Sequence, residues 1–196
     1  MEPEEQNSIP FDPLQSAAEH LLTRCHQSTV AIARTTLLTD PERRNRIWRW
    51  RCQLHATDRL VPKTVIIKQV RPEGYDPSSP QAWDTGRFFN DWAGARFLTE
   101  CAPDEGHGPA FFGGDVQQGF IILEDMGEHT SLVEPLLQGD ATSASEALIA
   151  FARRLGRMHA CSVGKEAQYR EIQRQISPAW AERDVPSADA ASQDGY

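Results

Sequence analysis

The stretch Thr64-Val65-Ile66-Ile67-Lys68-Gln69-Val70 places one lysine in a run of mostly β-branched residues. Such a run predicts a β-strand, because branched side chains pack well on a pleated surface. A lysine in this setting is more often the solvent-facing member of an alternating strand than a functional group. The segments around the stretch therefore decide how Lys68 is interpreted.

Two strands and a short helix are predicted before this stretch. In the segment 47–54, every second residue is apolar, which is the period of a strand with one buried face: Trp48, Trp50, Cys52 and Leu54. The segment 29–37 is rich in β-branched residues and predicts a first strand, and residues 14–26 predict a helix.

The helix predicted at 83–100 carries an acid on its apolar side. Phe88, Trp92 and Ala95 recur at helical spacing, and Asp91 lies on the same stripe. In the V-A-I-K strand pattern of kinases, a lysine binds nucleotide phosphates and a carboxylate from the next helix fixes its position. Asp91 is the candidate for that carboxylate. Glu100 lies about half a turn away around the helix axis, so the two acids cannot both face the sheet.

Two more strands and a second helix follow. The strands are expected near 110–112 and 120–124, joined across Gly113-Gly114-Asp115, which is typical of a turn. The helix at 144–160 places apolar side chains on one stripe, with Thr142 or Ser143 as its N-cap: Leu148, Phe151, Ala152, Leu155 and Met158. This order predicts an α+β fold with a mostly antiparallel sheet.

Composition narrows the classes of partner. The chain has 20 Lys plus Arg against 28 Asp plus Glu, and a net charge of −8 opposes binding to nucleic acid or to an anionic membrane. No apolar run approaches the roughly 20 residues of a membrane span, and no signal or transit peptide is found, so a cytoplasmic location is expected. The four cysteines are far apart in the sequence and lack C-x-x-C spacing, so we expect reduced thiols without a function.

Four features stand in a fixed order along the chain: Lys68, FFNDWAGARFL at 88–98, IILEDMG at 121–127 and LGRMHA at 155–160. Together they resemble the aminoglycoside phosphotransferase-like kinases over about residues 28 to 170. The resemblance implies a protein-kinase-like small lobe, with a five-stranded antiparallel sheet and one helix, followed by the first helices of a truncated helical large lobe. Such enzymes transfer the γ-phosphate of ATP or GTP to a hydroxyl group of a small molecule.

The same resemblance implies roles for individual residues. Lys68 would hold the phosphates, Asp91 would orient Lys68, and a hinge whose backbone meets the purine would consist of Leu123, Glu124, Asp125 and Met126. Because Asp91 is one methylene shorter than the glutamate usual in kinases, its pair with Lys68 is expected to be long or water-bridged. The loop 38–46 lacks glycine, and Arg44 with its neighbours Arg43 and Arg46 would supply phosphate contacts instead; a solvated turn is the alternative.

The acid and the Mg²⁺ ligands that phosphoryl transfer needs are expected from loops of the large lobe, and we find none here. We therefore assign no catalytic or metal-binding residue, and His159 is interpreted as a packed residue at a helix end. The predicted organisation is an acidic tail and short helix (1–27), a nucleotide-binding small lobe (28–126), a hinge-following segment with the first large-lobe helices (127–176) and a polar tail (177–196).

Two hypotheses of function follow. In the first, the chain is the nucleotide-binding portion of a small-molecule kinase, truncated before the catalytic loop and inactive alone; the intact enzyme would act on a small hydroxylated acceptor. In the second, it is a non-catalytic kinase-like module that binds nucleotide or protein. An unrelated α+β domain is a weaker third hypothesis. In the first hypothesis, the apolar stripe of helix 144–160 lacks the large-lobe helices that would pack on it, so it is expected to be exposed and to promote self-association.

Overall fold

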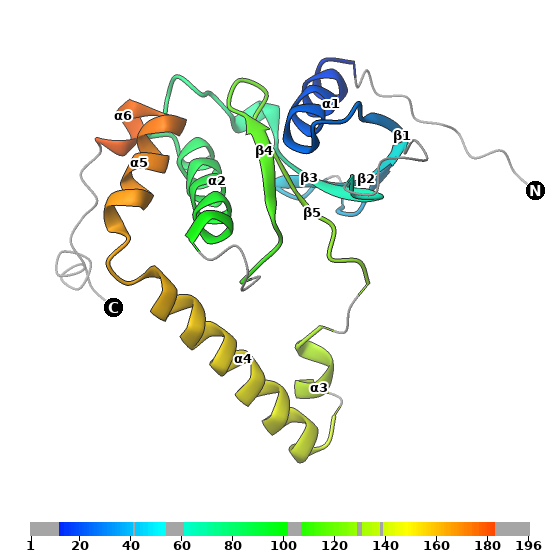
Figure 1. The fold of residues 1–196 in the computed structure, drawn as a ribbon, viewed down its shortest axis with the longest axis vertical. Helices are drawn as coiled ribbons and strands as arrows, with labels where there is room; N and C mark the ends of the chain where they lie inside the picture. Colours follow the sequence, from blue (N-terminus) through cyan, green and yellow to red (C-terminus); the bar gives the residue numbers. More distant parts are fainter. Residues whose placement is uncertain are drawn as a thin grey trace, which may run out of the picture.

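A computed structural model of the chain describes residues 12–40, 42–53, 61–101, 107–128, 131–137 and 139–182. At its centre is a five-stranded sheet with the order β1-β2-β3-β5-β4, in which all neighbouring strands are antiparallel (Figure 1). The strands are β1 (Ala31–Leu37), β2 (Asn45–Gln53), β3 (Thr64–Val70), β4 (Phe111–Asp115) and β5 (Phe120–Glu124). The α+β class and the five-stranded antiparallel sheet are thus confirmed.

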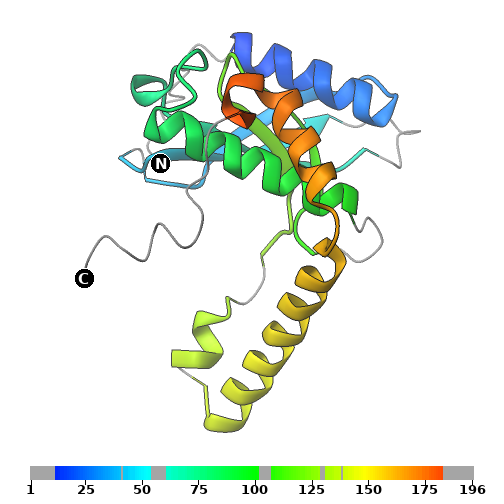
Figure 2. The same ribbon diagram turned by 90° about the vertical axis from the view of Figure 1, so that its left-hand side faces the viewer.

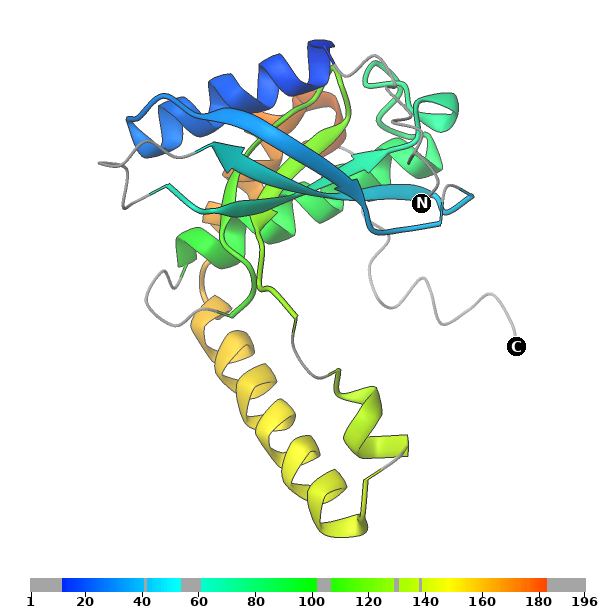
Figure 3. The same cartoon turned by 90° about the vertical axis from the view of Figure 1, so that its right-hand side faces the viewer.

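One face of the sheet is buried by the N-terminal helix. The alternation in β2 has its expected effect, since Trp48, Trp50 and Cys52 are all buried, whereas Leu54 lies outside the described residues. Helix α1 (Asp12–His26) lies across this face, with Leu14, Ala18 and Leu22 in the same core cluster (Figure 3). Because these positions recur every four residues, they form one apolar stripe. Helix α1 is therefore part of the core.

Helix α2 (Trp83–Cys101) covers part of the opposite face, through an apolar cluster that includes Phe88, Phe89 and Ile121. Two helices pack on α2 in turn: α5 (Glu166–Ile176) and α6 (Pro178–Ala181). The predicted polar tail from 177 onward is wrong for its first residues. Trp180 is fully buried, and its ring centroid lies 5.6 Å from that of Phe89. Residues 183–196, like residues 1–11, lie outside the described part.

The predicted turn at Gly113-Gly114-Asp115 is also wrong, because these residues continue β4 and the turn is formed by residues 116–119. Gly113 has a φ of +145° where the pairing of β4 with β5 shifts register. Gly114 has no room for a side chain, because a Cβ there would lie 2.6 Å from the Phe120 carbonyl oxygen and 2.9 Å from the Trp92 ring. Gly113 thus allows the irregular pairing of β4, and Gly114 allows Trp92 of α2 to pack closely against this strand.

Helix α4 (Ala141–Ser162) extends away from the sheet, with the short α3 (Val133–Leu137) beside its first half (Figures 1 and 2). Its N-cap is Asp140, whose carboxylate accepts hydrogen bonds from the N–H groups of Thr142 and Ser143, the two residues predicted to cap it. Leu148, Phe151 and Leu155 are exposed, as expected. His159 is exposed rather than packed. None of the helices in the described part combines the length and apolarity that a membrane span requires.

Candidate functional site

The strand register places Lys68 at the edge of the area of the sheet that α2 covers, because its partner on β5, Ile121, belongs to the α2 cluster. Lys68 lies opposite Ile47, and Ile66 is two residues away on the same face of β3. Ile47 and Ile66 are half-buried and belong to neither core cluster of the described residues. Leu38, whose N–H donates to the Ile47 carbonyl, is exposed. An apolar patch of Leu38, Ile47 and Ile66 therefore lies beside Lys68.

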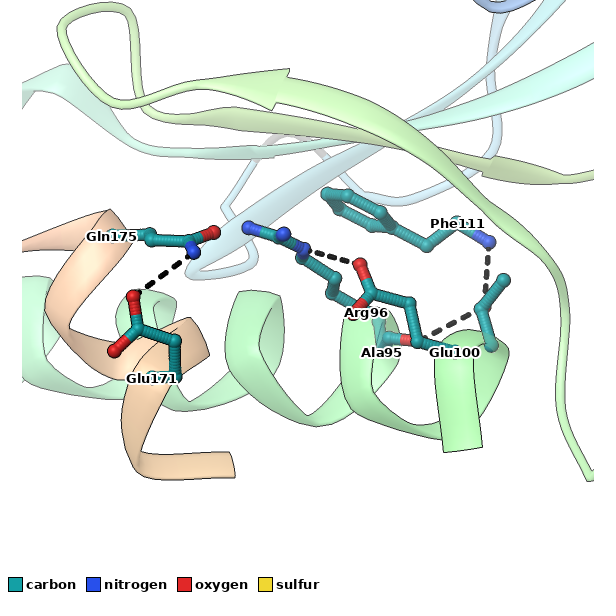
Figure 4. Close-up of polar contacts among 7 residues, drawn as sticks. Ala95, Arg96, Glu100, Phe111, Glu171 and Gln175 are labelled. Carbon is teal, nitrogen blue, oxygen red and sulfur yellow. Dashed lines mark hydrogen bonds and ion pairs between the residues drawn. The ribbon is translucent and has the colours of Figure 1, made fainter. Parts of the chain in front are cut away.

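Lys68 and Asp91 form a direct ion pair. The Lys68 Nζ donates to Asp91 Oδ2 at 2.7 Å, and the two side chains are 23% and 36% exposed. The expectation of a long or water-bridged pair is wrong, because α2 lies close enough to β3 for the shorter carboxylate to reach. Glu100 instead pairs with Arg96 at 2.6 Å, at the far end of α2 (Figure 4). The two acids face different directions, as their spacing predicts.

The predicted hinge divides into two parts. Leu123 and Glu124 are paired residues of β5, and the Glu124 N–H donates to the Ala110 carbonyl. Asp125 and Met126 follow the strand. Among the described residues, the backbone N–H of Met126 has no hydrogen-bond partner, and its side chain is exposed. The Met126 amide is therefore available to a ligand, whereas those of Leu123 and Glu124 belong to the strand ladder.

An ion pair that the sequence analysis missed fixes the start of this segment. Arg49 Nε lies 2.7 Å from Asp125 Oδ2, and its Nη2 donates to Oδ1 at 3.1 Å. The Asp125 side chain is only 5% exposed. Burial raises the pKa of this carboxyl, but hydrogen bonds from Gly127, Thr64 and Arg49 outweigh it and hold the pKa below its ordinary value. In the sequence, Arg49 stands out only as a polar residue of the alternating segment that forms β2. That pattern gives no signal for its pairing with Asp125.

Arg44 lies near the start of α2. Its Nη1 is 4.0 Å from Asp84 Oδ1, and Asp84 is two turns before Asp91, about 10 Å along the helix. A phosphate contact from Arg44 stays a prediction. Arg43 is exposed, and its N–H donates to the Asp40 carbonyl at 3.0 Å, an arrangement that fits the alternative of a solvated turn.

A basic hollow of about 190 Å³ lies on the same face, at the other end of β3. Thr64, in its wall, is about 13 Å along the strand from Lys68. Arg34 and Arg51 are direct cross-strand neighbours there, and neither contacts a carboxylate among the described residues. Cationic side chains thus lie towards both ends of β3 on this face, with Lys68 paired to Asp91 at one end and Arg34 and Arg51 at the other.

The described ranges place no group of three or more His, Cys, Asp or Glu side chains where it could hold a metal ion, so no residue is assigned to Mg²⁺. No protein-family model matches the chain, and no curated protein matches it.

Proposed function

We propose that this chain is the nucleotide-binding portion of a small-molecule kinase of the aminoglycoside phosphotransferase-like type. Such an enzyme would transfer the γ-phosphate of ATP, or alternatively GTP, to a hydroxyl group of a small acceptor. The observation that carries the proposal is the 2.7 Å pair between Lys68 and Asp91 beside the apolar patch of Leu38, Ile47 and Ile66, which belongs to neither core cluster of the described residues. Ligand sites are typically apolar surfaces with a few placed polar groups, and this face has that composition.

In this proposal each group has a physical role. The Lys68 ammonium donates to the phosphates, and Asp91 restricts the side chain to one direction, which lowers the entropy lost on binding. The purine lies on Ile66, between Lys68 and the Met126 N–H, from which it accepts a hydrogen bond, and Leu38 and Ile47 flank the phosphate end. Arg49 supports this donor indirectly, because it anchors the neighbouring Asp125.

The transfer step itself is not assigned to this chain. Mg²⁺ would supply charge neutralisation for the transfer, but no side-chain cluster in the described part of the chain fits it, and no residue here is proposed to position the acceptor hydroxyl. The expected behaviour of the chain alone is therefore nucleotide binding without phosphate transfer.

Titration calorimetry with ATP tests the proposal. The wild type is expected to bind, and Lys68→Met is expected to weaken binding about 10- to 100-fold, because a charge-assisted contact contributes roughly 1.5–3 kcal/mol. Lys165→Met is the matched control, since Lys165 Nζ donates to the Cys101 carbonyl at the far end of α2. Equal ATP affinity in the wild type and Lys68→Met would remove the assigned role.

A second candidate function is a self-associating interaction module. It is favoured by the exposed row of Leu148, Phe151 and Leu155 on the projecting helix α4, since soluble monomers seldom expose a large contiguous apolar patch. A chain that binds no nucleotide but forms a defined dimer through this row would support this candidate over the first.

A further inference from the structure

Two thiols that are distant in the sequence meet where α2 and α4 end. Cys101 is the last residue of α2, and Cys161 lies in the last turn of α4, 60 positions later. Their Sγ atoms are 3.6 Å apart, within hydrogen-bond distance for sulfur. Cys25 is exposed and Cys52 is buried in the core cluster under α1. The fold therefore brings together two free thiols that are far apart in the sequence.

The two thiols differ in their access to solvent. Cys101 is 8% exposed and lies in the apolar cluster of α2. Cys161 is half-buried at the edge of that cluster, so a small solute reaches it first. The Lys165 ammonium donates to the Cys101 carbonyl at 2.5 Å, which fastens the segment after α4 to the end of α2. Burial raises the pKa of the Cys101 thiol, and its hydrogen bond with Cys161 acts in the same direction.

We propose that Cys101 and Cys161 are a peroxide-sensitive pair that forms a disulfide between α2 and α4. The Cys161 thiolate attacks one oxygen of a hydroperoxide, the O–O bond breaks, and the protonated leaving group departs as water or alcohol. Cys161 is then a sulfenic acid. The Cys101 sulfur attacks the Cys161 sulfur, the S–O bond breaks, and hydroxide leaves as water with the Cys101 proton. Two thiols are oxidised and one peroxide is reduced.

The geometry requires little movement. A disulfide bond is about 2.05 Å long, so the two sulfur atoms must approach by about 1.5 Å. Side-chain rotation at two residues in terminal helical turns can supply this shift. The resulting bond would restrain α2, on which Asp91 lies about 15 Å from Cys101 along the helix axis. The inference does not depend on nucleotide binding.

The first test uses the full chain, reduced, freed of reductant and treated with hydrogen peroxide. We expect the intact mass to fall by two hydrogen atoms and trypsin to release one peptide pair joined through Cys101 and Cys161. Arg153, Arg154 and Arg157 separate the two cysteines, so they fall in different peptides. The melting temperature should rise by roughly 5–10 °C, because the bond closes a long loop, and dithiothreitol should reverse the rise.

Single variants test the order of the steps. Cys101→Ser should leave the sulfenic acid on Cys161, where dimedone labels it, and Cys161→Ser should form no disulfide. Cys25→Ser and Cys52→Ser are the controls and should form the same bond as the wild type. A wild-type mass that does not change, a bond that involves Cys25, Cys52 or a second chain, or a lower melting temperature after oxidation would each overturn the proposal. The wild-type experiment gives this answer even if a variant does not fold.

Discussion

Replacing Arg49 by leucine would isolate the contribution of the buried Asp125 carboxylate. The variant keeps an apolar stem of similar length in β2 but removes both contacts of the guanidinium, at 2.7 and 3.1 Å. In the wild type the Asp125 side chain is only 5% exposed, and Thr64 and Gly127 are its other donors. The variant therefore removes charge-assisted bonds from a carboxylate that lies almost entirely out of water.

The magnitude follows from this geometry. Breaking a fully buried pair by removing one partner costs roughly 3–5 kcal/mol. Arg49 is 29% exposed, and two hydrogen bonds to Asp125 survive, so we expect about 2 kcal/mol. For a chain of this size such a loss lowers the melting temperature by roughly 4–8 °C. Arg51→Leu is the control on the same face of β2, and its effect should stay within about 0.5 kcal/mol.

The pH dependence of the stability separates the electrostatic contribution of the Arg49–Asp125 pair from the packing of the Arg49 side chain. The pKa of Asp125 is lowered in the folded state, so its contribution to stability is present above the ordinary value of 3.8 and is lost as the pH falls through the folded pKa. Urea unfolding of the wild type and Arg49→Leu should therefore differ near pH 7, and the difference should be smaller at a pH below 3.8. An equal difference at both pH values would refute the electrostatic reasoning, because it would assign the loss to the packing of the arginine stem.

Three further predictions concern the fold and the exposed helix. Trp180→Ala should lower the free energy of unfolding by roughly 3–5 kcal/mol in a urea titration, because the ring is fully buried against Phe89; an unchanged midpoint would show that α6 is not part of the core. Gly114→Ala should destabilise the chain by more than about 1 kcal/mol, since its Cβ would collide with a backbone carbonyl, whereas Gly156→Ala on exposed α4, with no atom within 4 Å, should be neutral or stabilising. Leu148→Glu with Leu155→Glu should convert a self-associating chain to a monomer in light scattering, and a wild type that is monomeric and binds no hydrophobic dye would contradict the exposed-stripe hypothesis.

Local patterns predicted the elements that have a strong period. The alternation around Trp48 and Trp50 identifies β2 and its buried face, and the stripe through Phe88 and Trp92 identifies α2 with Asp91 on its inner side. The pairing of Lys68 with Asp91 was predicted from the kinase strand pattern and from the place of Asp91 on the apolar stripe, but the expected length of the pair was wrong.

The errors arise where tertiary contacts decide the structure. Gly113 and Gly114 look like a turn, but the close packing of Trp92 and a register shift require glycine there. The pairs Arg49–Asp125 and Cys101–Cys161 join residues 76 and 60 positions apart, and no local period indicates them. Trp180 lies among polar residues that suggest a tail. Ser177-Pro178, an N-cap followed by proline at the first helical position, is the signal that could have identified α6.

In the proposed function, Lys68, oriented by Asp91, contacts the phosphates of a nucleotide whose purine lies near Met126. The sharpest test compares the affinities of the wild type and Lys68→Met for ATP and for adenosine, which has the same purine and no phosphate. We expect Lys68→Met to weaken ATP binding about 10- to 100-fold and to leave adenosine binding unchanged. Equal losses for both ligands, or no loss for ATP, would rule out this role of Lys68.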